Sequence, residues 1–85
     1  MPGAYTWWKD KPFKIHRAQV VKITSTALPG TVVDIDPLQG MIVASGDKGL
    51  LLTEVQSAGK AAMAGDAFVR GNLIEPGTLL GTEPG

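Results

Sequence analysis

Short runs of apolar residues, several with a polar residue at every second position, recur along the chain and are separated by glycine and proline. Runs of this kind, rich in β-branched and aromatic residues, are typical of strands joined by turns. Pro-Gly fits the centre of a type II turn, because proline fixes φ and glycine accepts a positive φ. This dipeptide, at residues 2–3, 29–30, 76–77 and 84–85, therefore marks expected turns.

The first two predicted strands form a hairpin. Residues 4–8 predict a strand, "KDKP" predicts a tight turn, and residues 13–23 predict a long second strand. After Arg17 the alternation breaks, because residues 19–21 cannot all follow one two-residue period. A bulge or strong bend is expected there, and long bent strands are typical of small barrels.

Three further strands are predicted at residues 31–35, 41–45 and 50–55, with the loop "SGDKG" joining the last two. Residues 74–81 predict a final turn and a short strand that closes the sheet. Five or six short strands at near-regular spacing indicate a mainly β fold, a small closed or partly open barrel.

One short helix is predicted over residues 66–70, with a start that could lie nearer Lys60. Gly71 is its expected end, since glycine adopts the left-handed conformation that often terminates helices. Phe68 and Val69 are its expected contacts with the core.

The length of 85 residues predicts one domain, residues 1–85. The chain has no cysteine, which excludes disulfides and thiolate zinc sites and favours a reducing compartment. No apolar run approaches the roughly 18 residues that a membrane span needs. A soluble, cytoplasmic protein without a membrane partner is expected.

The charge is balanced overall but unevenly distributed. Eight Lys and Arg residues offset eight Asp and Glu residues, so the net charge indicates no particular partner. The first 22 residues, however, contain five cations and one acid, and in the first half of the second strand Lys14 and His16 share one face. Such a cluster suits a phosphate backbone, although a charge run is more often only a solvated face.

The chain offers little for catalysis. His16 is the only histidine, and a lone histidine on a basic strand is more often a surface residue than a catalyst. No second His or Cys accompanies it to build a metal site. The "AGK" at residues 58–60 is not a phosphate loop, because Glu54 stands where that motif requires glycine. We therefore expect a binding or structural module, with no catalytic residue, metal site or cofactor in this chain.

The two tryptophans are adjacent. On a strand Trp7 and Trp8 point to opposite faces, so at most one enters the core. The simpler explanation of the other is packing over a barrel end or against a neighbouring domain. The alternative is a platform on which a nucleic-acid base stacks.

Several motifs, in this order, resemble one family. The chain contains "PGAYT", "KIHRA", "LPGT", "GMIVASGDKG" and "VQSAGKAAM". Over residues 2–81 it resembles the C-terminal domain of methionyl-tRNA formyltransferase. Two positions depart from the family pattern: Ser57 stands where proline is frequent, and Ala61 stands where a second basic residue often follows Gly-Lys.

The resemblance implies an OB-like β barrel that follows a Rossmann-like catalytic domain and helps bind initiator methionyl-tRNA through a basic surface. Formyl transfer and the cofactor 10-formyltetrahydrofolate belong to that catalytic domain, whose sequence is not among these residues. Trp7 and Trp8 become candidate stacking residues. The expected RNA contacts are Lys9, Lys11, Lys14, His16, Arg17, Lys22 and Lys60.

Two other interpretations stay open. The domain could be the structural C-terminal barrel of a formyltransferase that acts on a non-RNA substrate, of the sugar-nucleotide or formyltetrahydrofolate hydrolase type. It could also be a free-standing barrel that binds another protein. A tryptophan patch away from the lysines would favour docking, and one interleaved with them would favour RNA.

Overall fold

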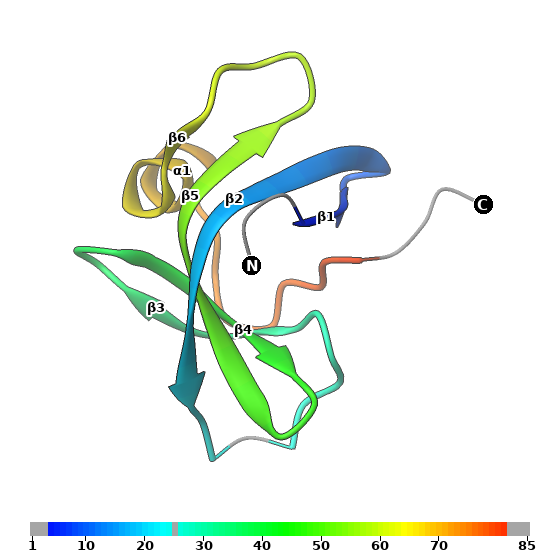
Figure 1. Cartoon of the computed structure of the whole chain (residues 1–85), viewed down its shortest axis with the longest axis vertical. Helices are drawn as coiled ribbons and strands as arrows, with labels where there is room; N and C mark the ends of the chain where they lie inside the picture. The colour runs from blue at the N-terminus through cyan, green and yellow to red at the C-terminus, as the bar shows by residue number, and fades with distance from the viewer. Residues whose placement is uncertain (1–3, 25, 82–85) are drawn as a thin grey trace.

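A computed structural model describes residues 4–24 and 26–81. This part of the chain is mainly β, with one short helix near its C-terminal end (Figure 1). The five strands predicted before the helix are all found, within two residues at either end, whereas the short closing strand predicted within residues 74–81 is not. The elements are β1 (Ala4–Trp8), β2 (Lys11–Lys22), β3 (Val32–Asp36), β4 (Gly40–Ser45), β5 (Lys48–Ser57), β6 (Met63–Ala64) and α1 (Gly65–Asn72).

The strands form one antiparallel sheet in the order β1-β2-β5-β4-β3, with β6 paired to β5. Its centre is the long pair β2 and β5, which curve together (Figure 1). The register between them shifts on both sides of Arg17, between Ile15 and Arg17 and between Arg17 and Ala18. The predicted break in β2 is therefore confirmed, and it bends the strand between its two halves.

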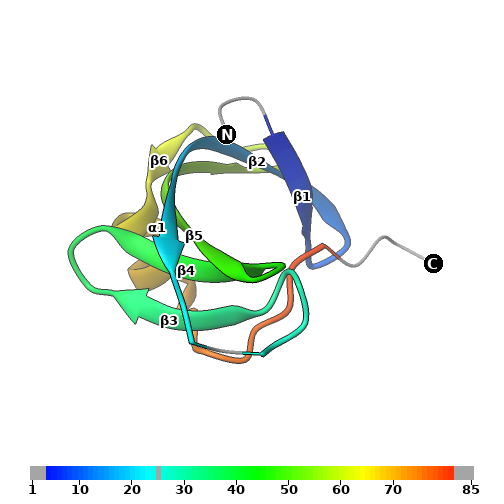
Figure 2. The same ribbon diagram turned by 60° about the horizontal axis from the view of Figure 1, so that its bottom comes forward.

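The predicted barrel, closed or partly open, is not confirmed, because the sheet ends at β1 and β3 and these two strands do not pair. Residues 77–81 run between them (Figure 2), where the Leu80 N–H donates to Gly30 O at 2.8 Å and the Gly81 N–H donates to Trp7 O at 2.8 Å. Gly77 and Gly81 have positive φ values of 97° and 88°, so this segment is not extended enough to form the expected closing strand.

The turns follow the sequence signals. Lys9 and Asp10 both have positive φ, at 51° and 63°, as a two-residue type I′ hairpin requires. Gly30 and Gly77 also have positive φ, and each follows a proline in a turn closed by a backbone hydrogen bond. Two of the four Pro-Gly turns are thus confirmed, while residues 2–3 and 84–85 lie outside the described residues.

The prediction that Gly71 ends the helix is wrong. α1 continues to Asn72, and Leu73 adopts the left-handed conformation with φ 53°. This turn brings Ile74 into the core, where it is buried, and its N–H donates to Val69 O at 3.1 Å. Tertiary packing of Ile74 therefore decides where the helix ends.

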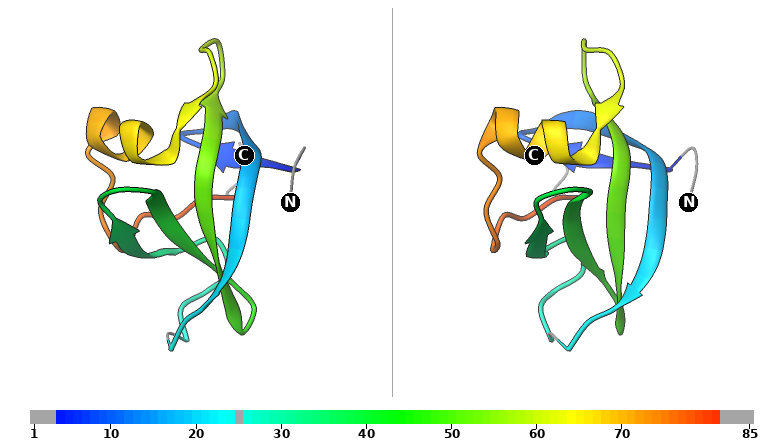
Figure 3. Two further views of the ribbon diagram at one scale, coloured as in Figure 1. Left: turned by 60° about the vertical axis from the view of Figure 1, so that its left-hand side comes forward. Right: turned by 90° about the vertical axis from the view of Figure 1, so that its left-hand side faces the viewer.

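The core lies between the curved sheet and α1, which packs against β4 and β5 (Figure 3). Phe68 of the helix is fully buried and its ring centroid lies 4.9 Å from that of Phe13 on β2. Val69 is buried as well, so both predicted helix contacts are confirmed. The largest fully buried side chains are Phe13, Phe68, Met41, Leu52, Val32 and Val55.

Among residues 4–24 and 26–81, no helix has the length and apolar content needed to cross a membrane.

Acid is expected to destabilise the domain through two surface carboxylates. The Asp36 pKa is lowered below 3.8 mainly because its carboxylate accepts the Leu38 N–H, and the Asp66 pKa is lowered mainly by its hydrogen bond from Arg70. A pKa that is lower in the folded state contributes stability above the unfolded pKa, and this contribution is lost as the pH falls through the folded pKa. Thermal unfolding from about pH 5 downward should therefore show a falling midpoint. The fall of the midpoint with pH should be shallower in the double variant Asp36→Asn/Asp66→Asn. An equally steep fall in this variant would contradict the view that these two carboxylates cause the loss of stability in acid.

A candidate nucleic-acid interface at the first hairpin

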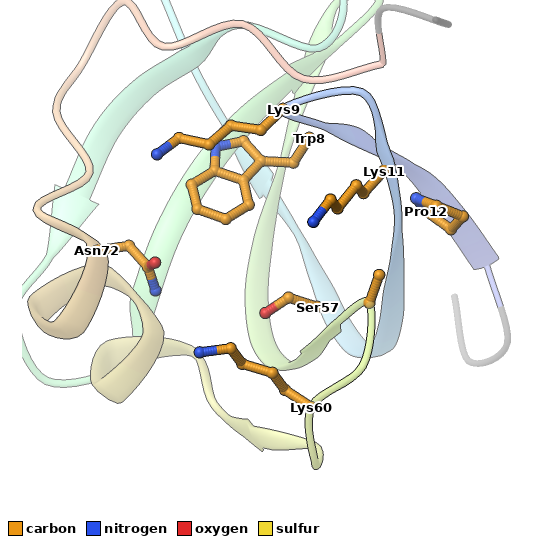
Figure 4. A pocket seen from close by; sticks show the side chains of 8 residues that line it. Trp8, Lys9, Lys11, Pro12, Ser57, Lys60 and Asn72 are labelled. Atoms are coloured by element: carbon orange, nitrogen blue, oxygen red, sulfur yellow. The ribbon is translucent and has the colours of Figure 1, made fainter.

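A pocket of about 230 Å³ lies where the β1–β2 hairpin, the end of β5 and the end of α1 meet (Figure 4). Four chain segments build it: the β1–β2 hairpin at its turn, Ser57 and Ala58 at the end of β5, the loop before β6, and the last residue of α1. Its lining residues are Trp8, Lys9, Lys11, Pro12, Ser57, Ala58, Lys60 and Asn72.

Trp8 forms one wall of this pocket and connects it to the core. Its ring meets Phe68 edge-on, with centroids 5.1 Å apart, and lies 6.3 Å from Phe13. Trp7 points to the opposite face of β1, where its ring is 6.3 Å from that of Tyr5. Both tryptophans are half-buried, so the prediction that no more than one enters the core is confirmed, and Trp8 is the one that packs against it.

Three lysines surround the pocket. Lys9 Nζ lies 4.9 Å from the centroid of the Trp8 ring, a cation–π contact, while Lys11 and Lys60 approach from the two sides (Figure 4). In the described part of the chain, ion pairs join Arg17 to Glu54 and Arg70 to Asp66, and none involves these lysines. The positive charge around the pocket is therefore not neutralised locally, which favours an anionic ligand.

The outer face of the same hairpin carries Lys14, which lies opposite Tyr5 on β1 and Gln56 on β5. It lines a second, smaller hollow of about 140 Å³, and Pro12 lines both this hollow and the Trp8 pocket. Because cross-strand partners share a face, Tyr5, Trp7 and Lys14 form a mixed aromatic and basic surface.

His16 is connected to the loop that carries Lys60 through the side chain of Gln56. The Gln56 side-chain nitrogen donates to the Lys60 carbonyl at 2.8 Å, so its oxygen faces His16 Nε2, also at 2.8 Å. His16 Nε2 must therefore carry the proton and donate it. This chain of hydrogen bonds ties the loop that carries Lys60 to the centre of the sheet.

The two remaining predicted RNA contacts, Arg17 and Lys22, do not line the Trp8 pocket. Arg17 sits at the bulge, and its Nε lies 3.3 Å from Glu54 Oε1. Lys22 is at the far end of β2, opposite Lys48 and beside Asp34. The structure thus brings together Lys9, Lys11 and Lys60, places Lys14 and His16 next to them, and separates Lys22 from the group.

Sequence reasoning missed Ser57 and Asn72 as pocket residues. Ser57 stands out in the sequence only as a departure from a family pattern, and Asn72 has no sequence signal at all. Asn72 reaches the pocket because α1 ends beside the hairpin, which depends on how the helix packs and not on local sequence.

Known proteins match nearly the whole chain. The family model described as "Formyl transferase, C-terminal domain" matches residues 1–73. The methionyl-tRNA formyltransferase of Bacillus subtilis (strain 168) is 46% identical over 81 residues, which cover 94% of this chain and 25% of that protein. The methionyl-tRNA formyltransferase of Thiobacillus denitrificans is 43% identical over 82 residues, 95% of this chain and 26% of that protein.

The chain therefore spans about a quarter of the length of the curated relatives it matches. The matched region corresponds to their C-terminal domain, as the sequence motifs indicated. On this evidence, the chain belongs to the formyl transferase C-terminal domain family.

Proposed function

We propose that this domain binds tRNA through the Trp8 pocket and the adjoining face of the first hairpin. In this proposal it positions initiator methionyl-tRNA for formylation by a catalytic domain that uses 10-formyltetrahydrofolate. The relatives' name, methionyl-tRNA formyltransferase, supports the substrate. The observation that carries the proposal is the convergence of Lys9, Lys11 and Lys60 on one half-buried tryptophan, with no acidic partner among the described residues.

The proposed role of these lysines is to hold phosphates. Lysine provides a point charge that binds a phosphate without reading sequence, so it fixes orientation and leaves the choice of base to other groups. Lys14 extends the charge onto the outer face, and His16 contributes indirectly through Gln56 and the Lys60 loop. The proposal gives Lys22 no part in this contact, because it lies at the other end of β2.

The arrangement of aromatic rings favours an RNA-binding surface over a surface that only packs against a neighbouring protein domain. Trp8 lies among three lysines on the inner face of the hairpin, and the Tyr5–Trp7 pair lies beside Lys14 on the outer face. A surface for a neighbouring protein domain would be expected to keep its aromatic rings apart from such a concentration of like charge. Interleaved cations and aromatic rings are the combination found at single-stranded nucleic-acid surfaces.

Charge reversal near the two ends of the β2–β5 pair tests this function. Lys11→Glu/Lys60→Glu should weaken tRNA binding by about 100-fold or more at low salt. The slope of log K against log salt concentration should become shallower by about two, the amount expected for the loss of two phosphate contacts. The matched control Lys22→Glu/Lys48→Glu makes the same change in net charge at the far end of β2 and β5. It should weaken binding by less than about fivefold, through the long-range field alone.

The measurement is a titration with initiator tRNA at several salt concentrations, with thermal unfolding as a check that each variant is folded. Equal losses of affinity in the two double variants would show that only net charge matters and would contradict a site at the first hairpin.

A further inference from the structure

The size of the Trp8 pocket limits what it can hold. Its volume, about 230 Å³, falls below the range of roughly 300–1,000 Å³ that is usual for drug-sized ligands. A duplex can lie across such a pocket but cannot enter it. A single base with its sugar or phosphate is of the right order.

The pocket combines the groups that a nucleotide needs. Apolar surface comes from the Trp8 indole together with Pro12 and Ala58. Lys11 and Lys60 line the pocket from two different segments, the hairpin and the loop before β6, so an anion in the pocket has two cations around it (Figure 4). Lys9 lies over the indole without an acidic partner in the described chain, so it is available to the same anion.

Asn72 gives the pocket a directional acceptor. Its side-chain nitrogen donates to the Phe68 carbonyl at 3.0 Å, which fixes the amide and leaves its oxygen without a partner among the described residues. Figure 4 shows this side chain pointing toward the centre of the pocket. A fixed carbonyl oxygen accepts a hydrogen bond from an amino group, such as the exocyclic amine of cytosine, whereas the carbonyl that uracil has at the same position cannot donate to this oxygen.

We propose that the pocket binds one unpaired nucleotide of RNA, with its base against Trp8, its exocyclic amine donating to Asn72 Oδ1 and its phosphate between Lys11 and Lys60. This inference rests on the proposed tRNA binding and deepens it. It predicts that the domain prefers single-stranded RNA to duplex RNA, and amino-bearing bases to uracil.

The test uses Trp8 as the reporter in a Trp7→Phe background, where it is the only tryptophan in the chain. Three RNA probes are titrated at one ionic strength: short oligocytidylate, oligouridylate of the same length, and a blunt RNA duplex. Oligocytidylate should quench Trp8 saturably and bind about tenfold more tightly than oligouridylate, the size expected for one hydrogen bond left unmade. The duplex should bind without quenching Trp8.

Asn72→Leu should reduce binding of oligocytidylate to the level of oligouridylate and leave duplex binding unchanged. If Asn72→Leu does not fold, the inference is still tested by the protein that retains Asn72, through its preference for oligocytidylate over oligouridylate. Inorganic phosphate is the last probe: it should compete only weakly, since it lacks the base.

Two results would overturn the inference and can be told apart. In the first result, the domain binds oligocytidylate, oligouridylate and the duplex with equal affinity, while tRNA binding still depends on Lys11 and Lys60. The pocket is then an anion site without base recognition. If tRNA itself does not bind even at low salt, the proposed function fails and the nucleotide site fails with it.

Discussion

Gly65→Ala is expected to destabilise the domain strongly. Gly65 is the first residue of α1 and is buried where the helix crosses β5. A Cβ at this position would collide with the Leu52 carbonyl oxygen and would lie 2.8 Å from the Gln39 carbonyl oxygen. Both obstacles are backbone, so relief requires moving the β4–β5 ladder, in which Leu52 pairs with Met41.

The expected loss of unfolding free energy is about 3 kcal/mol or more, at the upper end of the effects of single substitutions. A domain of this size has a total stability of only about 5–10 kcal/mol, so roughly a third or more of its unfolding free energy would be lost. Urea unfolding followed by circular dichroism measures this directly.

Gly71→Ala is the matched control, since the same substitution in the same helix meets no atom within 4 Å. It should stabilise the domain by about 0.5–1 kcal/mol, the usual gain when alanine replaces glycine inside a helix. If Gly65→Ala and Gly71→Ala have equal unfolding free energies, the close approach of α1 to β5 is not as the structure shows it.

Phe68→Ala should cost about 3–5 kcal/mol, because it removes a fully buried ring from the centre of the core. The same ring supports Trp8 at 5.1 Å and Phe13 at 4.9 Å. The substitution is therefore expected to shift the fluorescence of Trp8 to longer wavelength in the native baseline, since water reaches the indole. Stability is read from urea unfolding, and the spectrum is taken in the Trp7→Phe background.

Leu38→Ala is the control for this variant. Leu38 is equally apolar but 84% exposed, so its loss should change stability by less than about 0.5 kcal/mol and leave the Trp8 spectrum unchanged. A Phe68→Ala protein with an unshifted Trp8 spectrum would contradict the link between the core and the pocket wall.

The strands could be predicted because each has a local signal. The alternation in residues 13–16, its failure after Arg17 and the Pro-Gly turns all depend on neighbours in sequence, and the structure reproduces them. The end of α1 could not be predicted in this way. Gly71 has the better local propensity, but burial of Ile74 places the left-handed turn at Leu73 instead.

Closure of the sheet and the composition of the pocket both depend on tertiary contacts. Residues 77–81 contain enough apolar residues for a strand, yet the two flanking glycines bend them into isolated contacts with Gly30 and Trp7. The charge count along the chain groups Lys9, Lys11 and Lys22, because it registers only their nearness in sequence. A strand rises roughly 3.3 Å per residue, so the 12 residues of β2 hold Lys11 and Lys22 at opposite ends.

The most direct test of the central claim, that RNA contacts the Trp8 pocket, is an amide chemical-shift map of the 15N-labelled domain during titration with initiator tRNA. We expect the strongest shifts or broadening in residues 8–14, in residues 57–60 and at Asn72, which together surround the pocket. Lys22, Asp34 and Ile42, around the hollow at the other end of β2, should change little. Perturbations centred on that far end, with the pocket amides unmoved, would contradict the account.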